Sequence, residues 1–284
     1  MNCGREKRAC FVVRYPTPWL VMPIFDFHLR HLFGVLLIGS VAFSAPSVAQ
    51  STDAASLNRA LAQVDSLRTA GEFQDALTRL ESLRGTHGDN VAVLWRMSLT
   101  QVDVAKTLDG KDARKPRYKE ALTLADAALS ADTSNAHAHL AKAVAEGRIA
   151  LDAGTKERVQ RSRAVKRHAD RAIELDSSLD GAYHTRARWN REVADLGFFS
   201  RAIVKTVYGG LPEASFEQAV QDFERAIELH DERFHRLELA KTYLKMDREG
   251  KARKELKTAL EMPAEDPFDA QYAEEARKLI EDLE

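Results

Sequence analysis

The chain has 284 residues, enough for one large or two small domains, and its formal net charge is −1. Charged residues make up 30% and aromatic residues 7%, while proline and glycine are scarce, at 8 and 14 residues. This composition favours a helical protein with an alanine- and leucine-rich core and argues against a sheet built from tight hairpins. The near-neutral charge excludes nucleic-acid binding driven by bulk positive charge.

Residues 1–49 differ in character from the rest of the chain. A basic patch at His28–His31 precedes an apolar run over residues 32–45, and the small residues Ser47 and Ala49 follow. This order is typical of a secretory signal peptide. We therefore expect cleavage after Ala49 and an exported protein in the periplasm or cell envelope.

Two alternatives stay open for this leader. In one, residues 32–48 are a retained membrane anchor, although the apolar run is shorter than the ~20 residues of a typical span. In the other, the leader is disordered. The true start is Met1 or Met22, since the first 21 residues lie upstream of an ordinary signal peptide. Both cysteines, Cys3 and Cys10, lie in the leader, so the remaining chain has no thiol chemistry.

From Thr52 onward, apolar residues recur at spacings of three and four, as in amphipathic helices. The pattern predicts one domain over residues 50–284, built of about five helix pairs and a C-terminal capping helix with a polar outer face. The predicted helices cover residues 52–84 with a break at Gly71, 89–108 and 116–130, 135–153 and 155–175, 180–195 and 216–229, 232–246 and 249–262, and a last helix that starts at Asp266 and Pro267 and runs to about residue 283.

A short repeat indicates how these helices are organised. The pentapeptide RAIEL occurs at residues 171–175 and again at 225–229, and a degenerate copy, TALEM, follows at 258–262. A small residue followed by an aliphatic, an acid and an aliphatic, recurring with a period near 34, is typical of tetratricopeptide helix pairs. The distance between the first two copies exceeds this period by about 20 residues. We therefore expect an insertion at about residues 196–215, after which Ser215 and Gln218 form a capping box that restarts the helix.

This insertion and its flanks carry a family resemblance. The segment WNREVADLGFFSRAIVKTVYGGLPEASFEQA at residues 189–219 closely resembles the regulator of microtubule dynamics family, as do LAKTYLKM at 239–246 and EEARKLI at 274–280. The resemblance covers roughly residues 135–280. It implies an all-helical, tetratricopeptide-like domain without catalytic residues, in a family linked to membranes, organelle contacts, lipid handling or microtubules. A cleaved export signal would keep the mature chain away from cytoplasmic filaments and so argues against a microtubule role.

The insertion also holds most of the candidate binding residues. Phe199, Ile203 and Val207 share one helical face, with basic residues between them. We interpret this segment first as an additional core element of the solenoid. The alternative is a helix that covers the concave groove or docks on a membrane or apolar ligand. The candidate binding residues here are Trp189, Phe198, Phe199, Arg201, Ile203, Lys205 and Tyr208.

A second candidate surface is the basic stretch of residues 156–171. It contains seven arginine and lysine residues and only two acids, so it is the strongest local excess of charge. A solvated helix face explains the stretch without any function. Recognition of an anionic lipid or an acidic partner is the functional alternative, with Arg161, Lys166 and Arg167 as its candidates.

No catalytic, metal or cofactor site is predicted. His137 and His139 are two residues apart and therefore lie on different helix faces. Gly154, Thr155 and Lys156 stand in the wrong order for a phosphate-binding loop and are explained by helix capping. The sequence thus predicts a non-catalytic tetratricopeptide scaffold that binds a protein or peptide partner in its concave groove. The alternatives are a lipid or membrane-surface module and, by family analogy, a regulator of microtubule dynamics; no cofactor and no nucleic-acid partner are expected.

Overall fold

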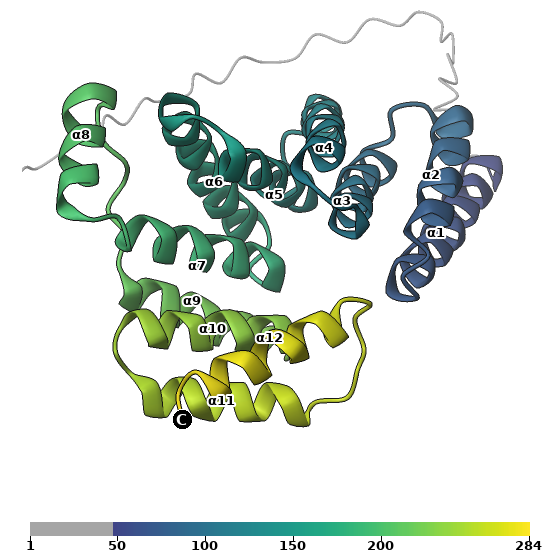
Figure 1. Cartoon of the computed structure of the whole chain (residues 1–284). Helices are drawn as coiled ribbons and strands as arrows, with labels where there is room; N and C mark the ends of the chain where they lie inside the picture. The colour runs from purple at the N-terminus through teal and green to yellow at the C-terminus, as the bar shows by residue number, and fades with distance from the viewer. Residues whose placement is uncertain (1–47) are drawn as a thin grey trace, which may run out of the picture. The chain divides into compact units, whose positions relative to one another are not determined.

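The computed structural model describes residues 48–284, with side chains except those of residues 48–52, 198 and 199. Within these residues the structure is entirely helical (Figure 1). The predicted leader and its apolar core at 32–45 lie outside the described residues, and Ala49 falls in the first turn of α1. The helices are α1 (Val48–Thr69), α2 (Phe73–His87), α3 (Val91–Thr107), α4 (Lys111–Ala131), α5 (Ala136–Asp152), α6 (Thr155–Leu175), α7 (Asp180–Ala194), α8 (Phe198–Tyr208), α9 (Phe216–Leu229), α10 (Arg233–Lys245), α11 (Glu249–Glu261) and α12 (Asp269–Glu281).

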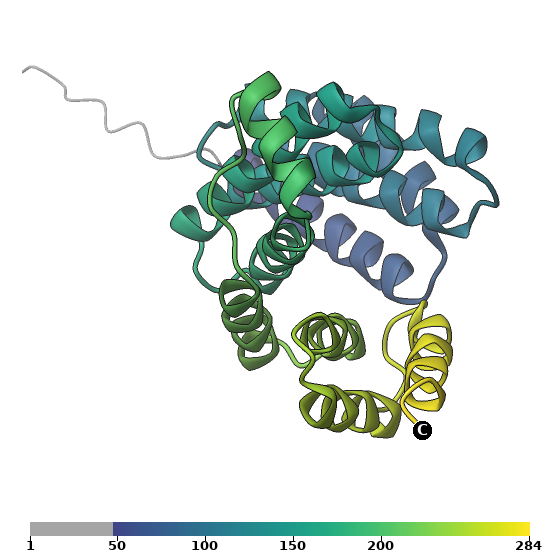
Figure 2. The same cartoon turned by 60° about the vertical axis from the view of Figure 1, so that its left-hand side comes forward.

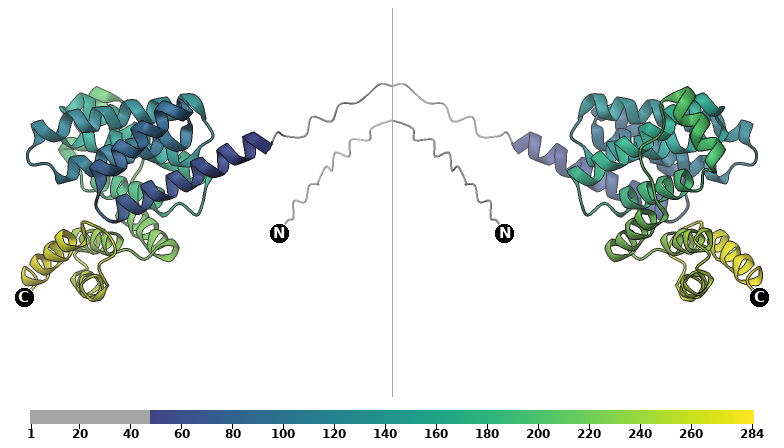
Figure 3. Two further views of the ribbon diagram at one scale, coloured as in Figure 1. Left: turned by 90° about the vertical axis from the view of Figure 1, so that its right-hand side faces the viewer. Right: turned by 90° about the vertical axis from the view of Figure 1, so that its left-hand side faces the viewer.

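Ten of these helices pack as five consecutive pairs, α1 with α2, α3 with α4, α5 with α6, α7 with α9, and α10 with α11. Helix α12 packs on the last pair, and α8 is the inserted element. Figure 3 shows α10, α11 and α12 grouped at the C-terminal end from two sides. The predicted solenoid of five pairs with a terminal cap is therefore confirmed.

The small residue of the repeat lies in the core; Ala172, for example, clusters with Leu140 of α5 and Ala182 of α7. Ala128, Ala172, Ala226 and Ala259 are all completely buried, each near the end of the second helix of its pair. In α4, α6 and α9 the same alanine carbonyl accepts the N–H of the residue that ends the helix, at 2.9–3.0 Å. A larger side chain at these positions would separate the helices, because protein cores are close-packed.

The fourth pair forms although α8 is inserted between its two helices. Asp222 in α9 is 2% exposed and accepts two hydrogen bonds from Arg186 in α7, at 2.7 and 2.9 Å. Phe223 beside it is completely buried. Ser215 caps α9 by accepting the Gln218 N–H at 3.0 Å, as predicted, but the Gln218 side chain donates to Asp222 instead of completing a capping box.

The two ends of the helical row touch. Phe73, at the start of α2, stacks on Phe268, just before α12, with ring centroids 5.3 Å apart and planes 8° from parallel. Gly71 has a φ of +80°, and a Cβ atom there would lie 3.2 Å from Cβ of Pro267. The turn between α1 and α2 therefore packs on the loop before α12 and closes the row into a ring (Figure 2).

Two helix starts differ from the prediction. Helix α4 begins at Lys111, so Pro116 lies inside the helix instead of opening it. Helix α12 begins at Asp269, two residues after Pro267. The buried Asp269 carboxylate accepts the N–H groups of Glu265 and Asp266 and pairs with Arg233 at 2.9 Å, which holds the preceding residues in a turn.

Pairs of histidines link neighbouring helices. Nδ1 of His139 in α5 lies 2.8 Å from Nδ1 of His168 in α6, and Nδ1 of His184 in α7 lies 2.8 Å from Nδ1 of His235 in α10. Each contact holds one proton, because a second would place two N–H donors against each other. Burial and the neighbouring His139 lower the pKa of His168 to about 4. Burial and His235 lower the pKa of His184 well below its usual value.

These lowered pKa values predict that the fold is sensitive to mild acid. The unfolded chain binds protons on these imidazoles near pH 6.5, before the folded chain does. The free energy of unfolding should therefore be highest above pH 6.5 and fall as the pH drops toward 4. Urea unfolding followed by circular dichroism at pH 7.5 and 5.5 measures this, and His168→Gln should reduce the difference. An unchanged difference in that variant would show that His168 does not contribute.

The buried pair between α7 and α9 gives a second prediction. Asp222→Ala leaves the partly buried Arg186 with only its longer contact to Asp170, at 3.3 Å, and should lower the free energy of unfolding by about 3 kcal/mol. The control is Asp195→Ala, which removes an exposed ion pair with Lys245 at 2.7 Å and should cost less than about 1 kcal/mol. Equal losses in the two variants would contradict the view that the Asp222 contact holds the interrupted pair together.

Candidate functional site

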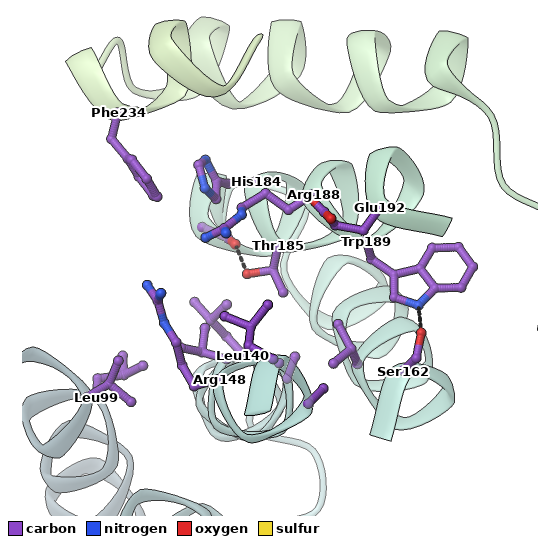
Figure 4. Close-up of a pocket in the computed structure, with 18 of the residues that line it drawn as sticks. Leu99, Leu140, Arg148, Ser162, His184, Thr185, Arg188, Trp189, Glu192 and Phe234 are labelled. Carbon is purple, nitrogen blue, oxygen red and sulfur yellow. Dashed lines mark hydrogen bonds between the residues drawn. The ribbon is translucent and has the colours of Figure 1, made fainter. Parts of the chain in front are cut away.

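A cavity of about 1000 Å³ lies on the concave side of the helical row. Its walls come mainly from α3, α5, α6 and α7, with contributions from α1, α2, α8, α10 and α12. Figure 4 shows part of it, with side chains from several helices directed into one space. The contact between Phe73 and Phe268 closes the ring around this space, so the cavity depends on both ends of the domain.

One wall of the cavity is apolar. Leu99, Leu140 and Val144 contribute aliphatic side chains from α3 and α5. Trp189 in α7 is 5% exposed and donates from its indole N–H to the Ser162 hydroxyl at 2.9 Å (Figure 4). With that polar group satisfied, the indole serves as an apolar wall for any molecule inside.

Two arginines adjoin this apolar wall. Arg148 in α5 is half-buried, and within the described residues its guanidinium group has no ion pair or hydrogen bond. Arg188 in α7 lies near it, with Nε 3.5 Å from a carboxylate oxygen of the buried Glu238. Burial, followed by repulsion from Arg188, lowers the pKa of Arg148. The cavity therefore contains positive charge that the described protein groups compensate only in part.

A corner of the cavity combines two acids with two histidines. His235 Nε2 lies 3.0 Å from Asp180 and 3.6 Å from Glu232. Burial raises the pKa of Glu232; burial acts in the same direction on Asp180, but the hydrogen bond and charge of His235 outweigh it and lower that pKa. Nε2 of His184 is buried without a partner among the described residues.

This corner is also where ligands for a metal ion come together. One atom each from Asp180, Glu232 and His235 lies within 4.8 Å of the others. Glu232 and His235 lie together at the start of α10, but Asp180 on α7 is 52 positions before Glu232, so no local spacing in the sequence indicated the three residues as a group. The hydrogen bond between His235 and Asp180 accounts for their proximity without an ion.

The predicted insertion residues divide between the cavity and the outer surface. Trp189 and Ile203 line the cavity, whereas Lys205 and Arg201 line a second hollow of about 900 Å³ beside α8. Arg201 donates to the carbonyls of Leu196, at 2.9 Å, and Ala194, and so ties α8 to the end of α7. Tyr208 is partly buried and lines neither space. The side chains of the last two candidates, Phe198 and Phe199, lie outside the described residues.

The interpretation of α8 as an additional core element is wrong. Ile203 and Val207 are 55% and 63% exposed, and of the apolar side chains described in α8 only Val204 is buried. Helix α8 stands at the edge of the helical row in Figure 1. It is held at its C-terminal end by Arg163, which donates from α6 to the carbonyls of Tyr208 and Gly210.

The basic stretch of α6 is neutralised in part by its neighbours. Arg161 forms ion pairs with Glu146 at 2.6 Å and Glu157 at 2.7 Å, and Lys166 pairs with Asp170 at 2.5 Å. Arg167 is exposed and does not line the cavity. The structure thus spreads these three candidates over different surroundings and does not bring them together as one anion-binding surface.

The cavity arginines were missed because they are single residues on different helices, 40 positions apart. The sequence does contain a signal for cavity-lining positions. It becomes visible when the helices α3, α5 and α7 are aligned on their N-caps, which are Asn90, Asn135 and Leu179. The cavity-lining positions nine residues later are Leu99, Val144 and Arg188, and those thirteen residues later are Asp103, Arg148 and Glu192.

Comparison with known proteins gives relatives in animals. The chain is 28% identical to regulator of microtubule dynamics protein 1 of Bos taurus, over 79% of this chain and 71% of that protein. It is 27% identical to the Mus musculus protein of the same name, over 99% of this chain and 91% of that protein. It is 28% identical to the Caenorhabditis elegans protein of that name, over 76% of this chain and 96% of that protein.

These relatives correct the predicted location. The periplasm and cell envelope are bacterial compartments, whereas the curated relatives are animal proteins, so the prediction of an exported, periplasmic or cell-envelope protein is wrong. A signal-like order of basic, apolar and small residues was an insufficient basis for it. Among the helices of residues 48–284, none has the length and apolar character needed to cross a membrane.

Solved structures and a family model agree with the predicted fold and resemblance. A thermophilic TPR protein of Thermus thermophilus superposes with a TM-score of 0.57 at 16% identity, over 78% of this chain and 98% of that chain, which shows the fold. The model of regulator of microtubule dynamics protein 1-3 matches residues 60–284, well beyond the resemblance at 135–280. The chain is therefore a member of the regulator of microtubule dynamics protein 1-3 family.

Proposed function

We propose that this protein is a non-catalytic scaffold that binds a peptide segment of a partner protein in its concave cavity. The observation that carries the proposal is the cavity itself, about 1000 Å³ in volume and lined by helices of successive pairs. Helical repeats use such concave surfaces for binding. The volume also lies at the upper end of the range of about 300–1000 Å³ that is common for ligand pockets.

The distribution of charge in the cavity favours a peptide over a lipid. Polar groups of both signs lie along the walls, from Asp103 on α3 through Arg148 on α5 to Glu192 on α7. A peptide presents polar and apolar groups in alternation and can match such walls. An acyl chain needs a continuous apolar surface, since polar groups facing hydrocarbon lose their hydrogen bonds with water.

The exposed face of α8 supports a second candidate, a lipid or membrane surface. Ile203 and Val207 are one helical turn apart and exposed, and the basic Lys205 lies between them. Apolar and basic residues on one helix are the features of interfacial binding. This surface differs from most of the cavity wall, so substitutions can separate the two candidates.

The names of the relatives supply a third candidate, the microtubule as the partner. The argument against a microtubule role rested on export, and that prediction is wrong. Cosedimentation of the purified full chain with polymerised microtubules tests this candidate directly. If the protein is recovered in the pellet, and if blocking the cavity abolishes that recovery, the segment bound in the cavity belongs to the microtubule.

The cavity proposal predicts different effects for two substitutions. Leu99→Trp places a larger side chain into the cavity and should weaken binding of a peptide at least about tenfold, because it removes space and apolar contact. Val207→Asp changes the exposed face of α8 and should leave peptide binding unchanged. Suitable probes are 12-residue peptides selected from a random display library on the full chain, with the Kd measured by fluorescence anisotropy.

Leu99→Met is the matched control, since it keeps the size and apolar character of the side chain. Circular dichroism and thermal unfolding show whether each variant is folded. If Val207→Asp abolishes binding while Leu99→Trp does not, the α8 surface is the binding site and the cavity proposal fails.

A further inference from the structure

The guanidinium group of Arg148 has an unusual environment for an arginine. It projects from α5 into the cavity, and Figure 4 shows Arg188 directed toward the same space from α7. Within the described residues it has no hydrogen bond and no ion pair. Arginines that are withdrawn from bulk water are normally paired, because an unpaired charge loses hydration without compensation.

Neighbouring carboxylates do not neutralise this charge. Asp103 on α3 is bound by Arg68 at 2.7 Å and by Lys106 at 3.3 Å. Lys106 is itself held over the ring of Phe268, with Nζ 4.5 Å from the centroid, which orients it within the cavity wall. On this side of Arg148, two cations share one carboxylate.

On the α7 and α10 side, the carboxylate that contacts Arg188 is shared in the same way. Glu238 is buried and contacts Arg191 at 2.6 Å, Lys241 at 2.9 Å and Arg188 at 3.5 Å. Three cations therefore share this carboxylate, and Arg188 has the longest of the three contacts. Tyr118 and Tyr272 also lie near Arg148, but phenols are neutral at physiological pH.

We propose that Arg148, assisted by Arg188, anchors a carboxylate of the bound peptide, so that the partner segment is acidic at one fixed position. The inference rests on the cavity being the peptide-binding site. A guanidinium group presents paired N–H donors that match a carboxylate. Apolar wall residues such as Leu99 and Leu140 would contact the flanking side chains of the same segment.

The pKa of Arg148 is consistent with this role. Burial and repulsion from Arg188 lower it, and an anion placed between the two arginines relieves the repulsion. The apo protein carries an unfavourable charge that ligand binding compensates, which is a common feature of functional sites. In contrast, the surface cations Arg161 and Lys166 already have their acidic partners.

The test is a selection of random 12-residue peptides on the full chain and on its Arg148→Gln variant. Wild-type protein should enrich peptides with aspartate or glutamate at one aligned position, and the variant should lose that preference. For a selected peptide, Arg148→Gln should weaken binding about 10- to 100-fold, as expected for a charge-assisted hydrogen bond. Replacing the acid of the peptide by its amide should have little further effect in the variant.

Two further variants control the experiment. Arg79→Gln removes an exposed arginine on α2 outside the cavity and should leave binding unchanged. Arg148→Lys keeps the charge and should restore part of the affinity. Without peptide, Arg148→Gln should have a melting temperature equal to or above that of the wild type, whereas a purely structural arginine would give a lower one.

The possible failures are distinguishable. Peptides that bind in the cavity, are blocked by Leu99→Trp and show no acidic preference would overturn the anchor while preserving the proposed function. If no selected peptide requires the cavity for binding, both the anchor and the proposed function are overturned. Phosphatidic acid vesicles are the remaining probe: vesicle binding that depends on Arg148, without peptide binding, would assign the anion to a lipid head group and overturn the peptide proposal.

Discussion

A completely buried alanine near the end of the second helix of a pair is the packing constraint on which the rest of this structure depends. Ala128, Ala172, Ala226 and Ala259 occupy it in four successive pairs. The concave side of the row is lined mainly by α3, α5, α6 and α7. The curvature brings the turn at Gly71 against Pro267, and this contact encloses the cavity. A cavity of this size therefore depends on contacts between the two ends of the row as well as on packing between neighbouring helices.

The insertion illustrates how the repeat accommodates extra chain. Helices α7 and α9 pair through Asp222 and Arg186 as though α8 were absent, so the additional residues are placed at the edge of the row. Arg163 and Arg201 attach α8 by donating to backbone carbonyls. Among its described side chains, Ile203 and Val204 contribute to the cavity wall, whereas Val207 is exposed.

The sequence predicted the helices and their pairing well because these depend on local patterns. Apolar spacing, the Ser215 cap and the recurring alanines act over a few residues and could be recognised directly. The start of α12 was misplaced because Asp269 is fixed by Arg233, a contact between distant residues. The cavity escaped prediction for the same reason: Arg148 and Arg188 become neighbours only when the helices stack. The number of residues between each N-cap and its cavity-lining positions could be counted in the sequence. That count identifies cavity residues only when the first helices are known to face inward.

Charge was the least reliable guide to the site, and the structure shows why. Seven basic residues between 156 and 171 form a conspicuous run, yet Arg161, Lys166 and Arg163 are engaged by carboxylates or carbonyls of the fold. Single arginines in apolar surroundings attract no notice in a sequence, although a desolvated cation costs more than an exposed one. A protein retains such a cost where binding compensates it. The absence of a partner among the described residues, rather than the density of charge, is therefore what distinguishes Arg148.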